Sequence, residues 1–237
     1  MYSSAFCRIY NEFGWNVYPE VLAEQLWEWL TRRGASVRTG LDLGCGTGVL
    51  CGALSARGVA AAGIDLSEGM IALARERYPA CRFTVADMTA YAPAETFDLV
   101  TCTGDALNHL FSLEDVERVF RNVYGYLAPG GYFVFDLLRE TEIPEGEPFE
   151  LPYSDAVRAV FQTDRDGEEI VRLRVAVYEN GEKTLEEEIR EKVHDPETVC
   201  ALLRRTGFTV LQCADRLLPE AGHGTTWFIA ARKGPGQ

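Results

Sequence analysis

Short apolar runs alternate with longer segments of helical periodicity along the middle of the chain. Five runs have the length of buried strands: residues 41–43, 59–64, 82–85, 97–102 and 132–137. Apolar residues recur at helical spacing in three segments: residues 49–56, 67–78 and 113–127. Because strands that alternate with helices form parallel sheets covered on both faces, the pattern predicts an α/β fold with a Rossmann-like doubly wound sheet.

The end of the chain completes this sheet. A helix is predicted between Asp195 and Gly207, with Pro196 at its first position and the glycine after its end. Apolar strands at residues 208–213 and 227–231 then bring the sheet to seven strands, the last of them antiparallel. All of residues 1–237 are expected to form one domain.

Two segments depart from the alternation of strands and helices. Residues 1–33 are predicted to be helical and are rich in aromatic residues. Residues 138–192 show the period-two pattern of strands, with Asp166-Gly167 and Asn180-Gly181 placed as hairpin turns, and therefore predict a β insert after the fifth strand.

Composition limits the classes of partner and compartment. The net charge of −13 disfavours a grip on nucleic acid, which relies on clustered Lys and Arg. The seven cysteines include no CxxC pair, so neither a zinc site nor a disulfide framework is expected. No apolar run has membrane-spanning length. We expect a cytoplasmic protein without a metal, a membrane partner or a nucleic-acid partner; the oligomeric state stays open.

The candidate ligand site begins at residues 41–48, which read Leu-Asp-Leu-Gly-Cys-Gly-Thr-Gly. The pattern indicates a strand, a glycine turn and the start of a helix. Such a turn can bring backbone amides close to a polar ligand. The dinucleotide fingerprint would require Gly or Ala at Val49, so the spacing differs from that motif. The alternative is a glycine-rich connection that serves the fold alone.

With Asp42 inside the strand and Cys45 between the glycines, this octet resembles the first motif of class I S-adenosylmethionine (SAM) dependent methyltransferases. The string at residues 127–136, Leu-Ala-Pro-Gly-Gly-Tyr-Phe-Val-Phe-Asp, resembles the same family. The resemblance implies SAM as the cofactor and S-adenosylhomocysteine as the product. It also implies that Gly44, Cys45, Gly46 and Gly48 lie against the methionine moiety while Asp42 orders the loop.

The next two strand ends carry the remaining candidate cofactor contacts. Asp65 follows Gly44 by 21 positions, where an acidic side chain can accept hydrogen bonds from both ribose hydroxyls. Leu66 is expected to pack on the adenine. The resemblance implies that Asp87 and the adjacent Met88 contact the adenine amino group. The alternative is an aspartate that only begins a helix.

The loop after the fourth strand is expected to lie beside the reacting groups, with Thr103 at its start. The loop resembles that of sugar-amine N-methyltransferases, which implies that His109 and an N-terminal tyrosine, Tyr10, flank the acceptor. Tyr10 and Tyr18 would belong to a helical lid of residues 1–36. Two alternatives stay open: a structural role for His109, and aromatic packing for the tyrosines.

The expected function is transfer of the SAM methyl group to N or O of a small-molecule acceptor. The Asp-Pro-Pro-Tyr and Pro-Cys strings of base methylation are absent after the fourth strand. A SAM-binding protein without catalysis, and less so a nicotinamide oxidoreductase, are the alternatives. The β insert and the N-terminal helix are expected to wall the acceptor pocket. Glutamates that open the insert would favour a cationic acceptor, unless they form a solvated surface: Glu140, Glu142, Glu145, Glu147 and Glu150.

Overall fold

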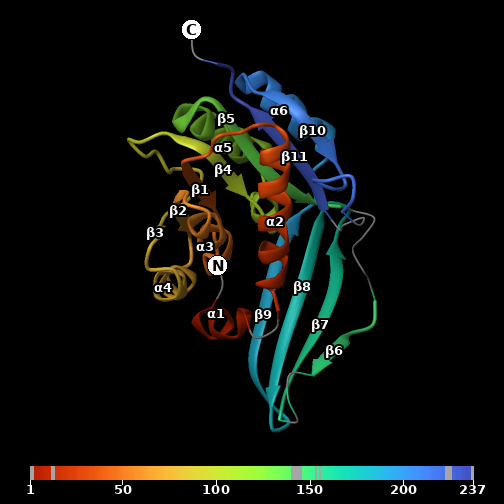
Figure 1. The fold of residues 1–237 in the computed structure, drawn as a ribbon. Coiled ribbons are helices and arrows are strands. Elements are labelled where there is room, and N and C mark those ends of the chain that lie inside the picture. Colours follow the sequence, from red (N-terminus) through yellow and green to blue (C-terminus); the bar gives the residue numbers. More distant parts are fainter. Residues whose placement is uncertain are drawn as a thin grey trace.

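The computed structural model describes residues 3–11, 14–139, 146–152, 154, 156–221 and 226–235. Its larger sheet has seven strands in the order β10-β11-β5-β4-β1-β2-β3 (Figure 1). The bounds are β1 Thr39–Leu43, β2 Ala60–Asp65, β3 Arg82–Val85, β4 Phe97–Cys102, β5 Leu127–Leu138, β10 Thr209–Ala214 and β11 Thr226–Arg232. The strands β1 to β5 pair in parallel, and β11 is antiparallel to both neighbours. The predicted seven-stranded α/β fold is confirmed.

Helices cover both faces of this sheet and enclose two apolar cores. One core packs side chains of α5 (Leu113–Tyr126) and α6 (Pro196–Thr206) against the strands, with Phe120 fully buried. The other packs α2 (Val17–Arg32), α3 (Val49–Ala56) and α4 (Glu68–Arg77) against the opposite face, with Leu26 and Trp29 at its centre. Burial on both faces explains why the strands read as continuous apolar runs.

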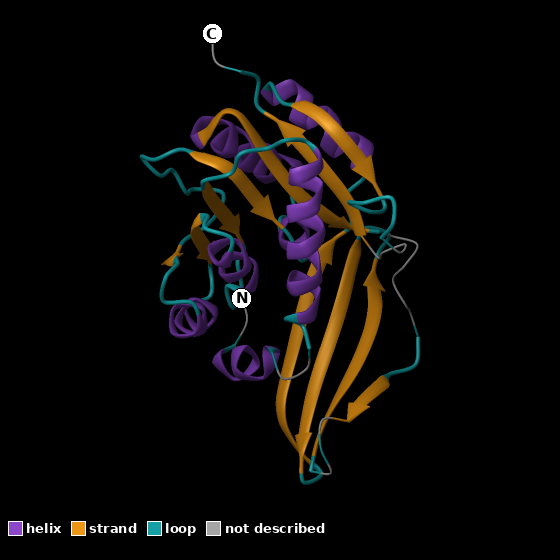
Figure 2. Ribbon diagram, in the orientation of Figure 1, coloured by secondary structure: helices purple, strands orange, loops and turns teal. Residues whose placement is uncertain are grey.

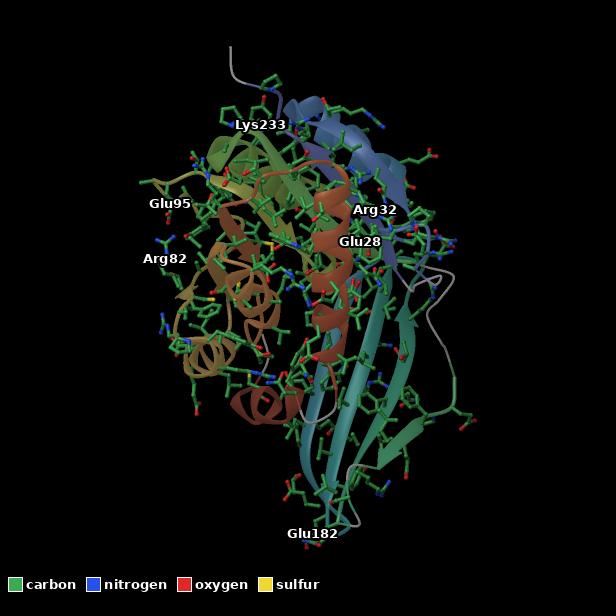
Figure 3. All side chains as sticks on the ribbon, in the orientation of Figure 1. Glu28, Arg32, Arg82, Glu95, Glu182 and Lys233 are labelled. Carbon is green, nitrogen blue, oxygen red and sulfur yellow. The ribbon has the colours of Figure 1, made fainter. Side chains whose placement is uncertain are left out.

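The β insert is a four-stranded antiparallel sheet in the order β6-β7-β8-β9. Its strands are β6 Phe149–Pro152, β7 Val157–Asp166, β8 Ile170–Glu179 and β9 Glu182–Lys192. Figure 2 shows these long strands extending away from the larger sheet, and Glu182 lies at their far tip (Figure 3). The turn at Asn180-Gly181 has positive φ at both residues, as a two-residue hairpin requires.

One face of the insert packs against the first helix, α1 (Ser4–Tyr10). Phe6 is fully buried there among Ala159, Phe161, Val175 and other apolar residues of β7 and β8. The N-terminal segment therefore forms two helices with different neighbours. Whereas α2 covers the larger sheet, α1 lies between the insert strand β9 and α4 (Figure 1).

Two strand predictions were wrong in detail. The strand β5 begins at Leu127 rather than at residue 132, because Leu127 pairs with Phe97 before the ladder resumes between Leu99 and Tyr132. The helix α5 therefore ends at Tyr126, and Pro129-Gly130-Gly131 lies in an irregular part of β5 rather than at the helix end. The edge strand β6 was not predicted, because its apolar side chains Phe149 and Leu151 are exposed and give no burial pattern.

The termini of several helices follow the chemistry of their sequences. The Ser67 hydroxyl accepts a hydrogen bond from the Met70 N–H at the start of α4, and Asp195 caps α6 in the same way.

None of the described helices has the length and apolar character needed to span a membrane. Ion pairs on the exposed surface, such as Glu28 with Arg32 on α2, are visible in Figure 3.

Candidate functional site

A cavity of about 760 Å³ lies where the carboxyl ends of β1, β2 and β4 meet the insert. Its walls come from the turns after these strands and after β3, from α1 and α2, and from β9. All site residues predicted from the sequence line this cavity except Gly48. The fold therefore gathers side chains that are widely separated along the chain at one edge of the sheet.

The three glycines of the first turn have positive φ but different surroundings. A Cβ on Gly46 would meet no protein atom within 4 Å, so this backbone faces the cavity. A Cβ on Gly44 would lie 2.8 Å from that of Ala106, and one on Gly48 would lie 2.7 Å from the Phe83 ring. Gly46 is thus the glycine that a ligand can approach, while Gly44 and Gly48 permit close packing of the turn.

Asp65 joins the first turn to the second. Its Oδ2 accepts a hydrogen bond of 2.9 Å from the Gly46 N–H, and its Oδ1 accepts one of 2.8 Å from the Ser67 N–H. Burial raises the pKa of the carboxyl, while these two hydrogen bonds oppose the rise. Leu66 beside it is half exposed and lines the cavity. Since each carboxylate oxygen has more than one acceptor direction, Asp65 can also accept from a ligand.

Asp42 is buried between two strands and lines the cavity. The Thr101 hydroxyl on β4 donates to its Oδ1 at 2.6 Å. Burial raises the pKa of Asp42 to about 7, and the hydrogen bond partly offsets this rise. The contact in the structure is therefore with a neighbouring strand, and the ordering of the glycine loop by Asp42 stays a prediction.

Asp87 and Met88 line the cavity after β3. The Asp87 Oδ1 accepts hydrogen bonds of 2.8 Å from both the N–H and the hydroxyl of Thr89. Such a local turn is the structural alternative to a ligand contact for this aspartate, and it occupies one of the two carboxylate oxygens. The contact with an adenine amino group stays a prediction for Asp87 and Met88.

The two tyrosines predicted for the lid differ in their environments. The Tyr18 hydroxyl on α2 donates a hydrogen bond to Asp136, which lies near the carboxyl end of β5. Tyr10 ends α1 and packs against Trp15, with ring centroids 5.2 Å apart. Burial, and then the negative charges of Asp65 and other carboxylates, raise the pKa of Tyr10 to about 12. Both rings line the cavity, together with Thr103 at the end of β4.

His109 ends the short helix η1 (Ala106–His109) and lines the cavity opposite the first turn. Its Nε2 lies 3.8 Å from the Glu191 Oε1 of β9, and its ring also hydrogen-bonds the backbone of Arg190. Loss of solvent around the ring lowers the pKa of His109. A neutral imidazole beside a carboxylate can accept a proton and then be stabilised by the negative charge.

Two residues that organise this region were not identified from the sequence. Asp136 accepts hydrogen bonds from the N–H groups of Gly104 and Asp105, at 2.9 and 3.0 Å, besides that of Tyr18. The side chain of Asn108 is fully buried; its Nδ2 donates to the Lys192 carbonyl at 2.7 Å and its Oδ1 accepts from the Leu138 N–H at 3.2 Å. Their partners are distant in the chain, so no local pattern indicates them.

Other residues that the sequence did not assign individually come from the N-terminal segment, from the loop before α5 and from the insert. Trp15, Phe111 and residues 187–190 of β9 line the cavity. Glu140, Glu142 and Glu145 of the predicted acidic stretch lie outside the described residues. In the part of the chain that the structure describes, no group of three or more His, Cys, Asp or Glu side chains could hold a metal ion.

Comparisons with known proteins bear on this arrangement. Residues 41–131 match the family model of the methyltransferase domain. A protein of Geobacillus sp. (strain WCH70) assigned to the methyltransferases is 32% identical over 134 residues, which are 55% of this chain and 53% of the relative. The dTDP-4-amino-2,3,4,6-tetradeoxy-D-glucose N,N-dimethyltransferase of Saccharopolyspora spinosa is 33% identical over 96 residues, 40% of this chain and 39% of the relative. The matches thus span about half or less of these relatives.

The solved structures extend the similarity to the whole fold. CalS10, an amino pentose methyltransferase of Micromonospora echinaspora solved with SAM bound, has a TM-score of 0.78 at 22% identity, covering 98% of each chain. At this identity the likeness concerns the fold. Because the coverage is nearly complete, this likeness includes the N-terminal helices and the insert. Residues 41–131 thus match the methyltransferase domain family, and the whole chain shares the fold of SAM-dependent methyltransferases of known structure.

Proposed function

We propose that this protein transfers the methyl group of SAM to N or O of a small-molecule acceptor, with S-adenosylhomocysteine as the product. The observation that carries the proposal is the meeting of Gly46 and Asp65 inside the cavity of about 760 Å³. The space in front of Gly46 is open, and a carboxylate stands at the end of the neighbouring strand. This combination suits a nucleoside ligand. SAM-bound CalS10, which shares the fold, supports the choice of cofactor.

The chain offers contacts along the full length of such a cofactor. Gly44, Cys45 and Gly46 would hold the methionine end, Asp65 the ribose hydroxyls, and Leu66 with Met88 the adenine. The ionised carboxylates of Asp42 and Asp65 would stabilise the positive charge of the sulfonium, and that charge would in turn offset the rise in their pKa that burial causes. SAM, when bound, supplies an electrophilic methyl group, and no metal is required for that chemistry.

The acceptor would bind at the end of the cavity formed by α1, η1 and β9. The aromatic rings of Tyr10 and Trp15 would exclude water there, and exclusion of water favours attack by a desolvated nucleophile. His109 would accept the proton that the nucleophile loses. Amino-sugar methyltransferases among the relatives and structural neighbours support a small-molecule acceptor.

Calorimetric titration with SAM tests the cofactor assignment. The variant Asp65→Ala is expected to bind SAM more weakly by roughly 1.5 to 3 kcal/mol, the range for hydrogen bonds to a charged group. Asp195→Ala is the control, because it removes a helix cap that does not line the cavity and should reduce stability without changing SAM affinity. Equal SAM affinity in wild type and Asp65→Ala would remove the ribose assignment.

Two further measurements separate the alternatives. Equilibrium dialysis against SAM and NADH should show retention of SAM; retention of NADH alone would indicate an oxidoreductase. Incubation with SAM and a broad panel of small acceptors should then yield S-adenosylhomocysteine. Tight SAM binding without product across that panel would instead indicate a binding protein of the same fold.

A further inference from the structure

Two cysteines lie together outside the cavity, at the edge of the larger sheet. Cys200 is on α6 and Cys213 is on β10, and these two elements pack against each other (Figure 1). The structure describes all seven cysteines of the chain, and Cys213 alone is exposed. Neither Cys200 nor Cys213 lines the cavity. The pair is therefore separate from the site described above and has no part in the proposed function.

The register of the sheet directs the Cys213 side chain towards α6. Cys213 pairs with Ile229 of the antiparallel strand β11, and directly paired residues of antiparallel strands point to the same face. Ile229 belongs to the same apolar core as Cys200. The preceding residue, Gln212, points the other way, because its Oε1 accepts a hydrogen bond of 2.8 Å from the Trp29 Nε1 of α2. Both thiols thus lie on the same face of the sheet.

An irregularity in β10 produces this orientation. Val210 packs against the core that contains Cys200, so strict alternation would turn Cys213, three positions later, to the opposite face. The register shifts between Val210 and Gln212, which makes Leu211 an additional residue in the strand. The additional residue returns Cys213 to the face of α6.

The two thiols contact each other. The Cys200 thiol donates a hydrogen bond to the Cys213 sulfur. This hydrogen bond and the positive charge of Arg204 lower the pKa of Cys213 to about 7, against the opposing effects of desolvation and of the carboxylates of Glu197 and Asp195. A large fraction of Cys213 is therefore thiolate near neutral pH, and the thiolate is the form of cysteine that attacks a disulfide.

We propose that Cys213 and Cys200 form a thiol–disulfide exchange site, at which a low-molecular-weight disulfide of the glutathione type converts the two thiols into a reversible intramolecular disulfide. Cys213 attacks the small disulfide because it is exposed, and the buried Cys200 resolves the mixed disulfide. Transient disulfides of this kind also occur in reducing compartments, unlike a structural disulfide framework. The sequence does not indicate the pair, because its spacing is not that of a CxxC motif.

The exchange takes place in two steps that need no other oxidant. The Cys213 thiolate, whose proton has passed to water, attacks one sulfur of the small disulfide; a new S–S bond forms, the old one breaks and one small thiolate leaves. The Cys200 sulfur then attacks the Cys213 sulfur, while its proton passes to the second small thiolate as that leaves. Two protein thiols are oxidised, and the small disulfide is reduced to two small thiols.

The first step prepares the second. In the reduced pair, the hydrogen bond to Cys213 is the main cause that raises the pKa of Cys200 well above its usual value, and burial adds to the rise. A mixed disulfide at Cys213 has no negative charge, so this main cause disappears when it forms. The Cys200 sulfur also lies beside the sulfur that it attacks, so the second step is intramolecular.

Exchange with glutathione disulfide tests the proposal on the full-length protein. After an acid quench and alkylation of the remaining thiols, peptide mapping by mass spectrometry should find Cys200 linked to Cys213, and dithiothreitol should reverse the link. The oxidised protein should melt roughly 6 to 12 °C higher, because the bond closes a loop of about 15 residues. The absence of reaction, a link between other cysteines only, or a lower melting temperature of the oxidised protein would overturn the proposal.

Two variants separate the roles of the pair. Cys200→Ala should stop the reaction at a glutathione adduct on Cys213, and Cys213→Ala should give neither an adduct nor a link. Alkylation of Cys213 by iodoacetamide should reach half its maximal rate near pH 7 in the wild type and at higher pH in Cys200→Ala, because the hydrogen-bond donor is lost. An unchanged pH profile, or a wild-type adduct that accumulates without the link, would contradict the assigned roles.

Cys102→Ala is the matched control. Cys102 is a fully buried thiol of the same apolar core, and β11 and β5 separate its strand, β4, from β10. Exchange in this variant should proceed as in the wild type. Equal loss of the linked product in Cys102→Ala and Cys200→Ala would indicate a general effect of a weakened core and would refute a local site. Because these measurements use neither SAM nor an acceptor, their failure is distinguishable from failure of the proposed function.

Discussion

The side chain of Asn108 offers the sharpest test of how the insert is attached to the reaction loop. It contacts both ends of the insert: Leu138 is the last residue of β5 and the first of the insert, and Lys192 is the last residue of β9. Asn108 also precedes His109 directly. Asn108→Ala would therefore remove the link that holds the insert and His109 in one arrangement.

The magnitude follows from the two hydrogen bonds. The substitution leaves the Leu138 N–H and the Lys192 carbonyl without their partner, and an unsatisfied buried group costs about 1 to 3 kcal/mol. We expect a loss of about 2 to 4 kcal/mol in the free energy of unfolding. For a chain of this length that corresponds to a fall of roughly 4 to 16 °C in melting temperature.

Thermal melting, SAM titration and acceptor kinetics on the same variant provide the assay. The acceptor KM should rise and proteolysis within residues 138–192 should accelerate, while SAM affinity stays nearly constant because the glycine turn is not involved. Asn122→Ala is the control, since the Asn122 side chain makes one hydrogen bond within the described part of the chain, to the Thr89 carbonyl at 2.9 Å. Equal effects of the two substitutions, or parallel losses of SAM and acceptor binding, would refute the reasoning.

Three further predictions concern the cavity. Gly46→Val and Gly48→Val both strain a backbone of positive φ, but only Gly48→Val places a side chain against the Phe83 ring. Gly46→Val should leave the protein folded by circular dichroism and abolish SAM binding in calorimetry. Gly48→Val should unfold the protein, which circular dichroism will show. Burial raises the pKa of Asp42 to about 7, so the protonated carboxyl contributes fully to the free energy of unfolding below about pH 4, and this contribution is lost as the pH rises to about 7. In urea denaturation, the free energy of unfolding of Asp42→Asn should therefore fall less over this pH range than that of the wild type. Identical pH profiles of the two proteins would contradict the prediction. His109→Ala should lower single-turnover rates by about a hundredfold with SAM affinity unchanged, whereas a structural histidine would lose both together.

Most of the larger sheet could be predicted because its signals are local. The central strand β4 is buried and largely apolar, and its predicted bounds at residues 97–102 agree with the structure. The bounds of β3 at residues 82–85 also agree, although this edge strand buries only Phe83. The helix caps Ser67 and Asp195 are likewise local signals. The exposed edge strand β6 and the early start of β5 could not be predicted, because pairing with a distant neighbour defines them.

The cofactor end of the cavity was predictable for the same reason, and the acceptor end was not. Gly46 and Asp65 stand at strand ends whose order along the chain fixes their position in the fold. Asn108 and Asp136, in contrast, are placed by partners that are distant along the chain: the Asn108 side chain donates to the Lys192 carbonyl, 84 residues away, and Asp136 accepts from the Tyr18 hydroxyl, 118 residues away. These contacts exist only in the folded arrangement, so no local pattern indicates them. The residues that join the insert to the reaction loop therefore become visible only in the structure, and the Asn108→Ala variant tests that connection directly.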